Sequence, residues 1–414
     1  GESVPEKLEN CKITLNNPSD DKELFNINSL PDSLFVEPGT KAPNRVGLSK
    51  YASYINSRSI EVYGRPLVIA MSADLADSTN ISGFAKGFDG AKDLGLYDYK
   101  TNEESPLIPQ GITEFTNSGM LAGLATVNFD ENPYEKFNGF YGAMSTYGSF
   151  SYLKYGPIRL FSQLAQDSDL KVGKLIWVAG HSGPETAEDS RTHFGIFAPG
   201  VTQLFPDGHI INLHPWEHNE VAPALAAALS TKVPVVALHL TRPPVEIPDR
   251  KKLGMASHLE ASKGAYIIKD YNHTKEKLGV IIVRGTSSTN SIVSLLEQLK
   301  KDGPNVKIVS AVSWELFSSQ PLKYQQNIIS DREWADSMII TNGALRLMHK
   351  WISNKIVEKY SMSPDFDNQW RTGGSVDEIV AESKLDSKSI LAGIRKFAND
   401  RSKRLELIEK SFPS

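Results

Sequence analysis

The segments LIWVAG (175–180) and HSGPETAEDSRTHFGIF (181–197) adjoin each other near the middle of the sequence. The first is a continuous apolar run with β-branched and aromatic residues, which is typical of a strand buried on both faces. The second begins with a loop, 181–193, that carries two histidines, an arginine and three acidic residues. A purely structural loop rarely needs so many titratable groups, so we expect a functional site behind this strand.

Similar apolar runs lie on both sides of this strand and alternate with segments of helical periodicity. The sequence predicts further strands over 66–74, 136–148, 209–215 and 233–241, and helices over 48–59, 116–127, 150–166 and 219–230. Continuous β-branched strands that alternate with helices indicate a parallel sheet covered on both faces. In such sheets, ligands bind at the loops that follow the carboxyl ends of the strands.

A second unit of the same kind follows the proline-rich turn TRPPVEIPDR at 241–250. Its predicted strands are 262–271, 278–285, 305–313 and 336–343, with a helix over 290–303 and a charged helical region at the C-terminus. We therefore expect an α/β protein of two doubly wound domains with mainly parallel sheets. The expected division is a linker or arm over 1–44, a first domain over 45–250 and a second over 251–414.

Composition excludes several classes of function. The 414 residues carry a formal net charge of −4 without a long basic run, which argues against nucleic-acid binding. The apolar runs are too short for a membrane-spanning helix. A single cysteine, Cys11, excludes internal disulfides and cysteine-rich zinc sites, and a reducing cytoplasm is the expected compartment.

Other predicted strand ends also carry polar or aromatic side chains. Asp74 and Ser78 follow the strand at 66–74, Glu114 adjoins a helix, and Tyr147 and Phe150 follow the strand at 136–148. Each has a structural alternative, because Asp commonly caps turns, Glu stabilises helix N-termini and aromatic residues fill cores.

Histidines elsewhere in the chain do not indicate a metal. His209 and His214 flank an apolar strand and His218 follows, but their spacing is not that of a zinc site. We predict no metal ligands on this chain.

Five segments follow one another in an informative order. They are SADLADSTN (72–80), GITEFTNSGMLAGLA (111–125), the loop pattern H-x6-ED-x2-TH (181–193), HPWEHNEVAPAL (214–225) and TRPP (241–244). This ordered set resembles the transketolase family, and the similarity covers about residues 45–414. One motif alone would be weak evidence, whereas the ordered set is strong evidence.

The resemblance implies a thiamine-diphosphate-dependent transferase that moves a two-carbon ketol unit between sugar phosphates in the pentose phosphate pathway. It implies that Glu114 hydrogen-bonds the aminopyrimidine ring of the cofactor, and that Tyr147, Phe150 and Asp74 complete the cofactor-binding residues. Asp189 and His193 would act on substrate oxygens as further catalytic residues. The remaining substrate-binding residues would be His181, Ser78 and Arg242, together with Asp189.

The chain also departs from the family pattern. Thr113 and Phe115 flank the glutamate where the family has Arg and His, and Ser190-Arg191 replaces Gly-Pro. Arg45 matches a family arginine only one position out of register, and the third aromatic position holds Leu153, next to Tyr152. These differences place phosphosugar specificity in question.

The larger departure concerns the diphosphate end of the cofactor. Transketolases bind the diphosphate and Mg²⁺ through a GDG motif in an N-terminal domain, and this chain has no such motif upstream of the matched region. FDGAKDLG at 88–95 lies inside the pyrimidine-binding region instead. We expect a split subunit or a fragment that requires a diphosphate-binding partner domain, which would hold Mg²⁺, and that forms a homo-oligomer such as a dimer.

Two other hypotheses stay open from the sequence. The chain could be the decarboxylating component of a 2-oxo acid dehydrogenase, or a non-catalytic domain pair that scaffolds or regulates a partner. The presence of Glu114 and the aromatic residues favours an enzyme.

Overall fold

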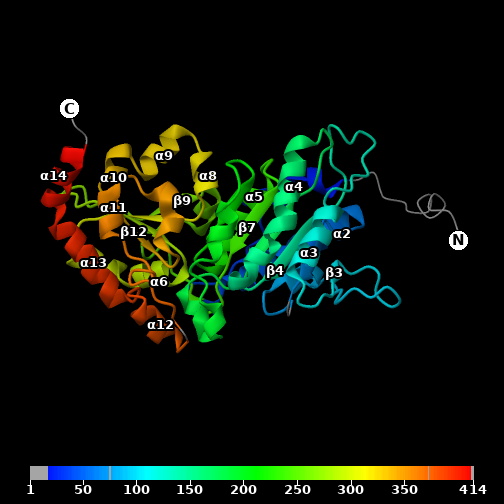
Figure 1. The fold of residues 1–414 in the computed structure, drawn as a ribbon, viewed down its shortest axis with the longest axis horizontal. Helices are drawn as coiled ribbons and strands as arrows, with labels where there is room; N and C mark the ends of the chain where they lie inside the picture. Colours follow the sequence, from blue (N-terminus) through cyan, green and yellow to red (C-terminus); the bar gives the residue numbers. More distant parts are fainter. Residues whose placement is uncertain (1–16, 74–75, 372, 412–414) are drawn as a thin grey trace.

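The computed structural model describes residues 17–73, 76–371 and 373–411, and it shows two α/β units side by side (Figure 1). Asp74, one of the expected cofactor-binding residues, lies outside the described residues. The first unit precedes the second in the chain, so the colours run from blue and green to yellow and red. In the described part of the chain, no helix is long and apolar enough to cross a membrane.

The first unit is built on a six-stranded sheet in which every pair of neighbours is parallel, in the order β3-β2-β4-β5-β7-β6. The strands are β2 (Val68–Ser72), β3 (Leu107–Ile108), β4 (Tyr141–Thr146), β5 (Leu175–Ala179), β6 (Ile210–Leu213) and β7 (Val235–His239). All residues of β4, β5 and β7 are buried, as their continuous apolar runs predict. The predicted parallel sheet is confirmed.

Helices cover both faces of this sheet. Alternate strand residues such as Val178 pack with α2 (Asn44–Tyr63) and α5 (His218–Leu229) in one core. Their neighbours, such as Trp177, pack on the opposite face with α3 (Glu114–Leu124) and α4 (Tyr155–Asp167). The helix expected from residue 150 begins later, because Gly148–Lys154 forms a 3₁₀ helix first.

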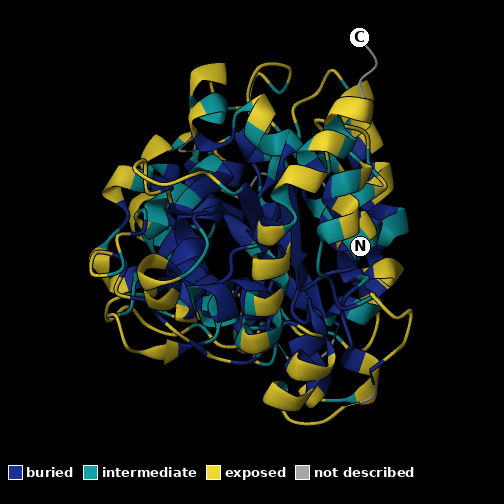
Figure 2. Cartoon of the chain, turned by 90° about the vertical axis from the view of Figure 1, so that its left-hand side faces the viewer, coloured by how far each residue is buried: buried dark blue, intermediate teal, exposed yellow. Residues whose placement is uncertain are grey.

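The second unit contains a four-stranded mixed sheet in the order β12-β10-β11-β9. Its strands are β9 (Ala265–Lys269), β10 (Val280–Arg284), β11 (Lys307–Ala311) and β12 (Ser337–Thr341). The three pairings are not all alike, because β9 at the edge runs antiparallel to β11 while β10 is parallel to both of its neighbours. Seen from the end that carries α13 and α14, buried strands occupy the centre and exposed helix faces lie outside (Figure 2).

The helices of the second unit are mostly short. They are α6 (Thr286–Ser294), α7 (Leu296–Lys301), α8 (Trp314–Ser318), α9 (Leu322–Ile328), α10 (Asp331–Ala335), α11 (Lys355–Tyr360), α12 (Val376–Glu382), α13 (Ser387–Asn399) and α14 (Arg401–Ser411). The single helix expected over 290–303 is divided into α6 and α7 at Leu295. Helix α13 buries Ile390, Ile394 and Phe397, which share one face at helical spacing.

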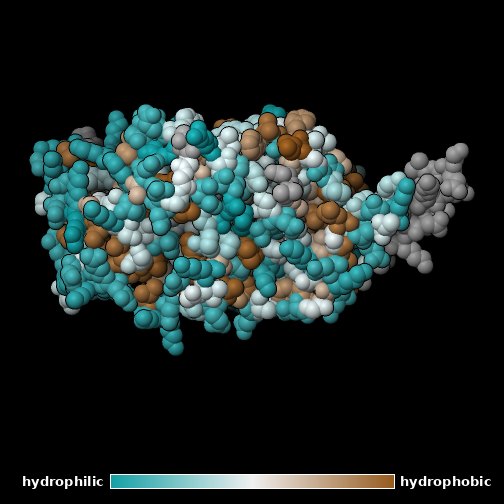
Figure 3. All heavy atoms as spheres, turned by 90° about the horizontal axis from the view of Figure 1, so that it is seen from below, coloured by the Kyte–Doolittle hydropathy of each residue, from teal (hydrophilic) through white to brown (hydrophobic). Residues whose placement is uncertain are grey.

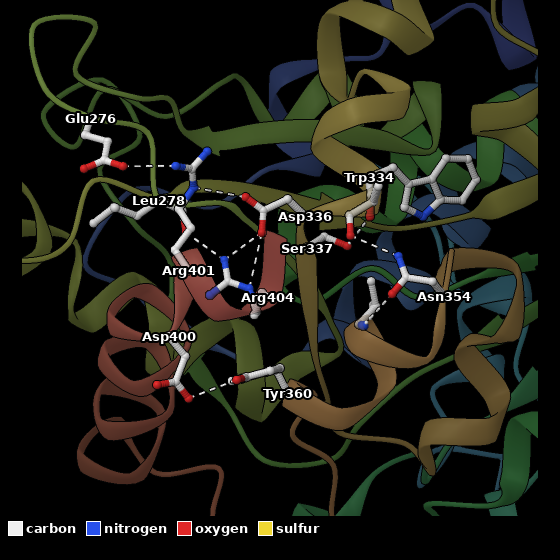
Figure 4. A network of polar contacts seen from close by, with 12 residues as sticks. Glu276, Leu278, Trp334, Asp336, Ser337, Asn354, Tyr360, Asp400, Arg401 and Arg404 are labelled. Carbon is white, nitrogen blue, oxygen red and sulfur yellow. Dashed lines mark hydrogen bonds and ion pairs between the residues drawn. The ribbon is translucent and has the colours of Figure 1, made fainter. Parts of the chain in front are cut away.

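A network of ion pairs between side chains holds α14 against the second sheet (Figure 4). Arg404 is 1% exposed and its Nη2 lies 2.7 Å from Asp336 Oδ1, just before β12. Arg401 Nε lies 3.2 Å from the other oxygen of the same carboxylate. A carboxylate shared by two guanidinium groups anchors the last helix, which could not be inferred from its largely polar sequence.

The described part of the N-terminal arm is packed rather than extended into solvent. Leu24 and Leu34 are buried in the main core, and the hydroxyl of Tyr51 donates to the carbonyl of Leu24. Strand β1 (Lys41–Ala42) pairs antiparallel with β8 (Val245–Glu246) in the proline-rich turn. The arm therefore reaches the segment that joins the two units.

Candidate active site

The loop that follows β5 folds around Asp189. Asp189 Oδ2 lies 2.8 Å from His193 Nδ1 and 3.6 Å from His181 Nε2, while its Oδ1 contacts Arg242 Nη1. Within the loop, the hydroxyl of Thr186 donates to the carbonyls of Gly183 and His193 at 2.8 and 2.7 Å. Four of the expected site residues, which come from two loops, therefore form one cluster, the Asp189 cluster: His181, Asp189, His193 and Arg242.

His181 is neutral at physiological pH. Its side chain is fully buried, and burial lowers its pKa to about 3, with His193, Arg45 and Arg242 acting in the same direction. Among the residues that the structure describes, neither ring nitrogen has a hydrogen-bond partner. A neutral imidazole with free nitrogens can donate one hydrogen bond and accept another, which suits a hydroxylated ligand.

Aromatic residues after β4 form the adjacent wall. The ring of Tyr147 lies 4.1 Å from the ring of His181 and 4.5 Å from that of His193, between centroids. Phe150 approaches the edge of His193 at 6.4 Å. Ser78 Oγ lies 2.9 Å from Tyr147 Oη, so the expected Ser78, Tyr147 and Phe150 all join the same site.

Arg45 also belongs to this region, although the sequence matched it only loosely. Its Nη1 donates to the backbone carbonyl of Ser78. Burial lowers the pKa of Arg45, and the nearby Arg242 lowers it further. Two guanidinium groups that oppose each other's charge favour the approach of an anion. The signal was present in the sequence, since Arg45 lies in the first turn of the helix that precedes β2.

Glu114 occupies the first position of α3, where the helix dipole favours a carboxylate. The residue is 5% exposed, and the Thr146 hydroxyl at the end of β4 donates to its Oε1 at 3.0 Å. Its neighbour Phe115 is 65% exposed, so a buried carboxylate lies beside an open apolar surface.

Lys154 is a buried lysine that the sequence analysis missed. Its Nζ donates to the carbonyls of Met144 and Val178 at 3.3 and 2.9 Å, and it lies 5.3 Å from the ring centroid of Trp177. Burial lowers its pKa well below the usual value, whereas the charge of Glu114 raises it. In the sequence it is a lone lysine, and nothing there distinguishes it from a surface residue.

The three acidic residues of the loop have separate roles. Asp189 is the centre of the cluster, and Glu188 Oε1 lies 3.6 Å from Arg242 Nη1. Glu185 is directed at the second unit, where its carboxylate accepts hydrogen bonds from the backbone and hydroxyl of Ser287 and from Asn342. Glu185 therefore joins the two units and is not available to a substrate.

His181, Asp189 and His193 could also be considered as metal ligands. Their candidate ligand atoms lie within 4.8 Å of one another. However, Arg242 contacts the carboxylate and Arg45 lies nearby, and two guanidinium groups oppose the binding of a divalent cation. The arrangement is better suited to a neutral or anionic ligand with several oxygen atoms.

A set of exposed apolar side chains surrounds the start of α3 and the 3₁₀ helix before α4. We call it the α3 surface, and its members are Ile112 (80% exposed), Phe115 (65%), Phe150 (38%), Tyr152 (49%) and Leu153 (52%). Figure 3 shows that hydrophobic residues are also exposed among hydrophilic ones on the face seen from below. Clustered exposed apolar residues are typical of a surface that another protein covers.

Comparison with known families accounts for both units. The pyrimidine-binding domain of transketolases matches residues 60–246, and the transketolase-like C-terminal domain matches residues 264–362. The chain belongs to the transketolase family. The first transketolase-type domain contains the Asp189 cluster and Glu114, and the second contains the partners of Glu185.

Curated transketolases are longer than this chain. Chloroplastic transketolase from Solanum tuberosum is 29% identical over 325 residues, which is 77% of this chain and 39% of the relative. Transketolase from Nostoc sp. is 27% identical over 327 residues, covering 77% of this chain and 43% of the relative. The chain thus spans about two fifths of the length of these relatives.

Solved transketolase structures share the fold. A transketolase from Leishmania mexicana superposes with a TM-score of 0.68 at 18% identity, covering 96% of this chain and 50% of that one. A protein described as a split gene transketolase, inactive β4 tetramer, gives a TM-score of 0.53 at 16% identity. In that case the match covers 84% of this chain and 97% of the other, so a transketolase-type chain of similar extent exists.

Proposed function

We propose that this chain is the pyrimidine-binding part of a transketolase-like enzyme that transfers a two-carbon ketol unit between sugar phosphates. A partner domain would hold the diphosphate of thiamine diphosphate and its Mg²⁺. The observation that carries the proposal is Glu114, a buried carboxylate beside the exposed α3 surface. It contacts Thr146 at the carboxyl end of β4, and the Asp189 cluster follows the carboxyl ends of other strands of the same sheet. The units 1–44, 45–250 and 251–414 are the domain division that we propose.

The residues present fit one end of the cofactor. Glu114 offers a carboxylate in a buried setting, and the expected aromatic residues Tyr147 and Phe150 lie at the start of the 3₁₀ helix that packs on α3, where their rings would meet an aminopyrimidine. Bound thiamine diphosphate supplies a nucleophilic carbon that accepts and releases the ketol unit. The diphosphate end is assigned to the partner, because the sequence lacks the family's GDG motif.

Glu114 would hold a proton shared with the aminopyrimidine ring. Its position at the first residue of α3 and the hydrogen bond from the Thr146 hydroxyl would hold the carboxylate in place to meet the ring. A partner that covers the α3 surface would remove water from the carboxylate and strengthen the interaction.

The Asp189 cluster would recognise the substrate. Asp189 would accept a hydrogen bond from a donor hydroxyl, and His193, held by Asp189 at 2.8 Å, would pass protons to and from substrate oxygens. His181 would bind a further oxygen as a neutral imidazole. Arg242 and Ser78 would contact the phosphate end, where a guanidinium group can form two parallel hydrogen bonds.

The experiment is reconstitution with a separately produced transketolase diphosphate-binding domain, Mg²⁺ and thiamine diphosphate. Exchange of the C2 proton of the cofactor is followed by NMR. We expect exchange only with both proteins present, and its loss in Glu114→Gln. Glu135→Gln, which changes an exposed glutamate of the same unit, is the matched control. Exchange that is equal in Glu114→Gln and wild type would contradict the assignment.

Two donors then test the Asp189 cluster. Asp189→Ala should keep C2 exchange but cost about 2–3 kcal/mol in kcat/KM with a hydroxylated donor, as expected for loss of a charged hydrogen-bond partner. The cost should be much smaller with a donor that lacks that hydroxyl. Equal losses with both donors would refute hydroxyl recognition.

Two alternatives are separated by the same preparation. Decarboxylation of pyruvate without ketol transfer would favour a 2-oxo acid dehydrogenase component. A complex that forms and yet shows no exchange would favour a scaffolding or regulatory role.

A further inference from the structure

A cavity lies between the two units, on the side of the sheets where β6 and β10 end. It has a volume of about 300 Å³, at the lower end of the range of small-molecule sites. Its lining includes Asn212 and His214 from the first unit and Arg284, Trp314 and Glu315 from the second. None of these residues belongs to the Asp189 cluster or to the α3 surface.

Arg284 is the feature of this cavity that needs an explanation. It is 4% exposed, and burial lowers its pKa to about 10, so it stays a cation at neutral pH. Its Nη1 donates to the carbonyl of Leu347 at 3.1 Å. Its Nη2 is buried and has no hydrogen-bond partner among the residues that the structure describes. A buried guanidinium with an unused donor is costly unless an anion binds it.

His214, which lines the cavity, does not compete for that anion. His214 stacks on His239 with ring centroids 4.5 Å apart. Burial lowers the pKa of His239 to about 3 and that of His214 well below its usual range. Both rings are therefore neutral, and His214, which lines the cavity with His239 stacked behind it, contributes a flat, weakly polar wall.

Glu315, a carboxylate of the cavity lining, already has other partners. Glu315 Oε2 accepts from the backbone N–H of Asn212 at 3.1 Å, and Glu315 Oε1 lies 3.4 Å from Lys350 Nζ. Lys350 is further tied to Asp207 at 2.6 Å. Glu315 thus lies near Arg284 without a hydrogen bond to it. Its negative charge repels a ligand that carries two negative charges.

We propose that this cavity binds a small monocarboxylate with a flat apolar body, whose carboxylate pairs with Arg284. The Glu315 charge disfavours a phosphate dianion, while Trp314, Phe205 and the neutral His214 provide surfaces for a planar apolar group. Since both units line the cavity, an occupant would stabilise their contact. The proposal is independent of the ketol-transfer function and can be tested on this chain alone.

Benzoate is a suitable probe, with benzamide as its neutral isostere and inorganic phosphate as the dianionic comparison. Titration calorimetry at pH 8, where inorganic phosphate is mainly the dianion and Arg284 is still charged, should give one benzoate per chain. Benzoate should bind at least about tenfold more tightly than benzamide or phosphate, because a charge-assisted hydrogen bond is worth that much. Arg284→Gln should weaken benzoate about tenfold and leave benzamide unchanged. Arg346→Gln, at an exposed arginine nearby, should change neither.

A second variant covers the case in which Arg284→Gln does not fold. Glu315→Gln removes the repelling charge and should tighten benzoate and phosphate, with little effect on benzamide. Benzoate affinity equal to that of benzamide, or unchanged in Arg284→Gln, would overturn the proposal. Phosphate that binds as tightly as benzoate to the wild-type chain would overturn the carboxylate assignment.

Discussion

Two groups of charges, the Arg250 cluster and the Asp189 cluster, both pair carboxylates with a guanidinium group but differ in burial and in the use of their hydrogen-bonding atoms. In the Arg250 cluster, Arg250 Nη2 lies 2.7 Å from Glu217 Oε1 and 2.8 Å from Glu220 Oε1. Both glutamates are fully buried. Their other oxygens accept from the backbone N–H groups of Asn219 and Trp216, at 2.6 and 3.2 Å. Every carboxylate oxygen of the cluster is therefore occupied.

The Asp189 cluster leaves capacity unused. The nitrogens of His181 have no hydrogen-bond partner within the described parts of the chain, and the side chains of Asp189 and Arg242 are 25% and 35% exposed. We infer that a buried cluster whose carboxylate oxygens are all occupied serves the fold, whereas a partly exposed cluster with unpartnered imidazole nitrogens suits a ligand. Four predictions test this distinction, beginning with the largest effect.

Arg250→Met should lower the free energy of unfolding by about 3–5 kcal/mol, because it leaves two buried carboxylates without a counter-ion. Urea denaturation followed by circular dichroism measures the change. Lys263→Met, which breaks the partly exposed pair with Glu260, is the control and should have a much smaller effect. A loss of similar size in both variants would remove the structural distinction of the Arg250 cluster.

Glu185→Ala should cost about 2–3 kcal/mol, because the donors on Ser287 and Asn342 lose a buried carboxylate acceptor. This residue lies in the same loop as Asp189 but belongs, by its contacts, with the structural group. Urea denaturation is again the measurement, with the exposed Glu246→Ala as control. A neutral result for Glu185→Ala would mean that the two units are joined mainly by apolar packing.

His181→Asn should reduce the pH dependence of stability. The pKa of His181 is about 3 in the folded chain, below its unfolded value, so the unfolded state takes up a proton first as the pH falls. Between pH 7 and pH 5 this residue should therefore cost the wild type about 2 kcal/mol, a loss that His181→Asn avoids. Urea titrations at the two pH values measure it, and the exposed His273→Asn should behave like wild type.

Asp189→Asn should change the free energy of unfolding by less than about 1 kcal/mol, because partly exposed ion pairs contribute little. The overall fold, checked by circular dichroism, should be unchanged. A destabilisation as large as that of Arg250→Met would place Asp189 in the structural group and weaken the case for a substrate site.

The sequence alone determined most of the architecture of the first unit. The apolar run of β5 and its relatives β4 and β7 could be recognised because a strand buried on both faces needs continuous apolar residues. The site at the carboxyl ends of these strands followed from the same topology, and His181, Asp189, His193 and Arg242 indeed lie together. The roles of these residues stay predictions.

Only the tertiary structure decided the features that depend on contacts between distant segments. The antiparallel direction of β9, the division of α6 from α7 and the packing of the arm by Leu24 and Leu34 have no local signal. The same holds for side-chain direction. Glu185 and Asp189 are four residues apart in one loop, yet one faces the second unit and the other the site. The local periodicity of hydrophobic residues indicates which residues are buried. The partner that a buried charge contacts depends on how the two units pack together.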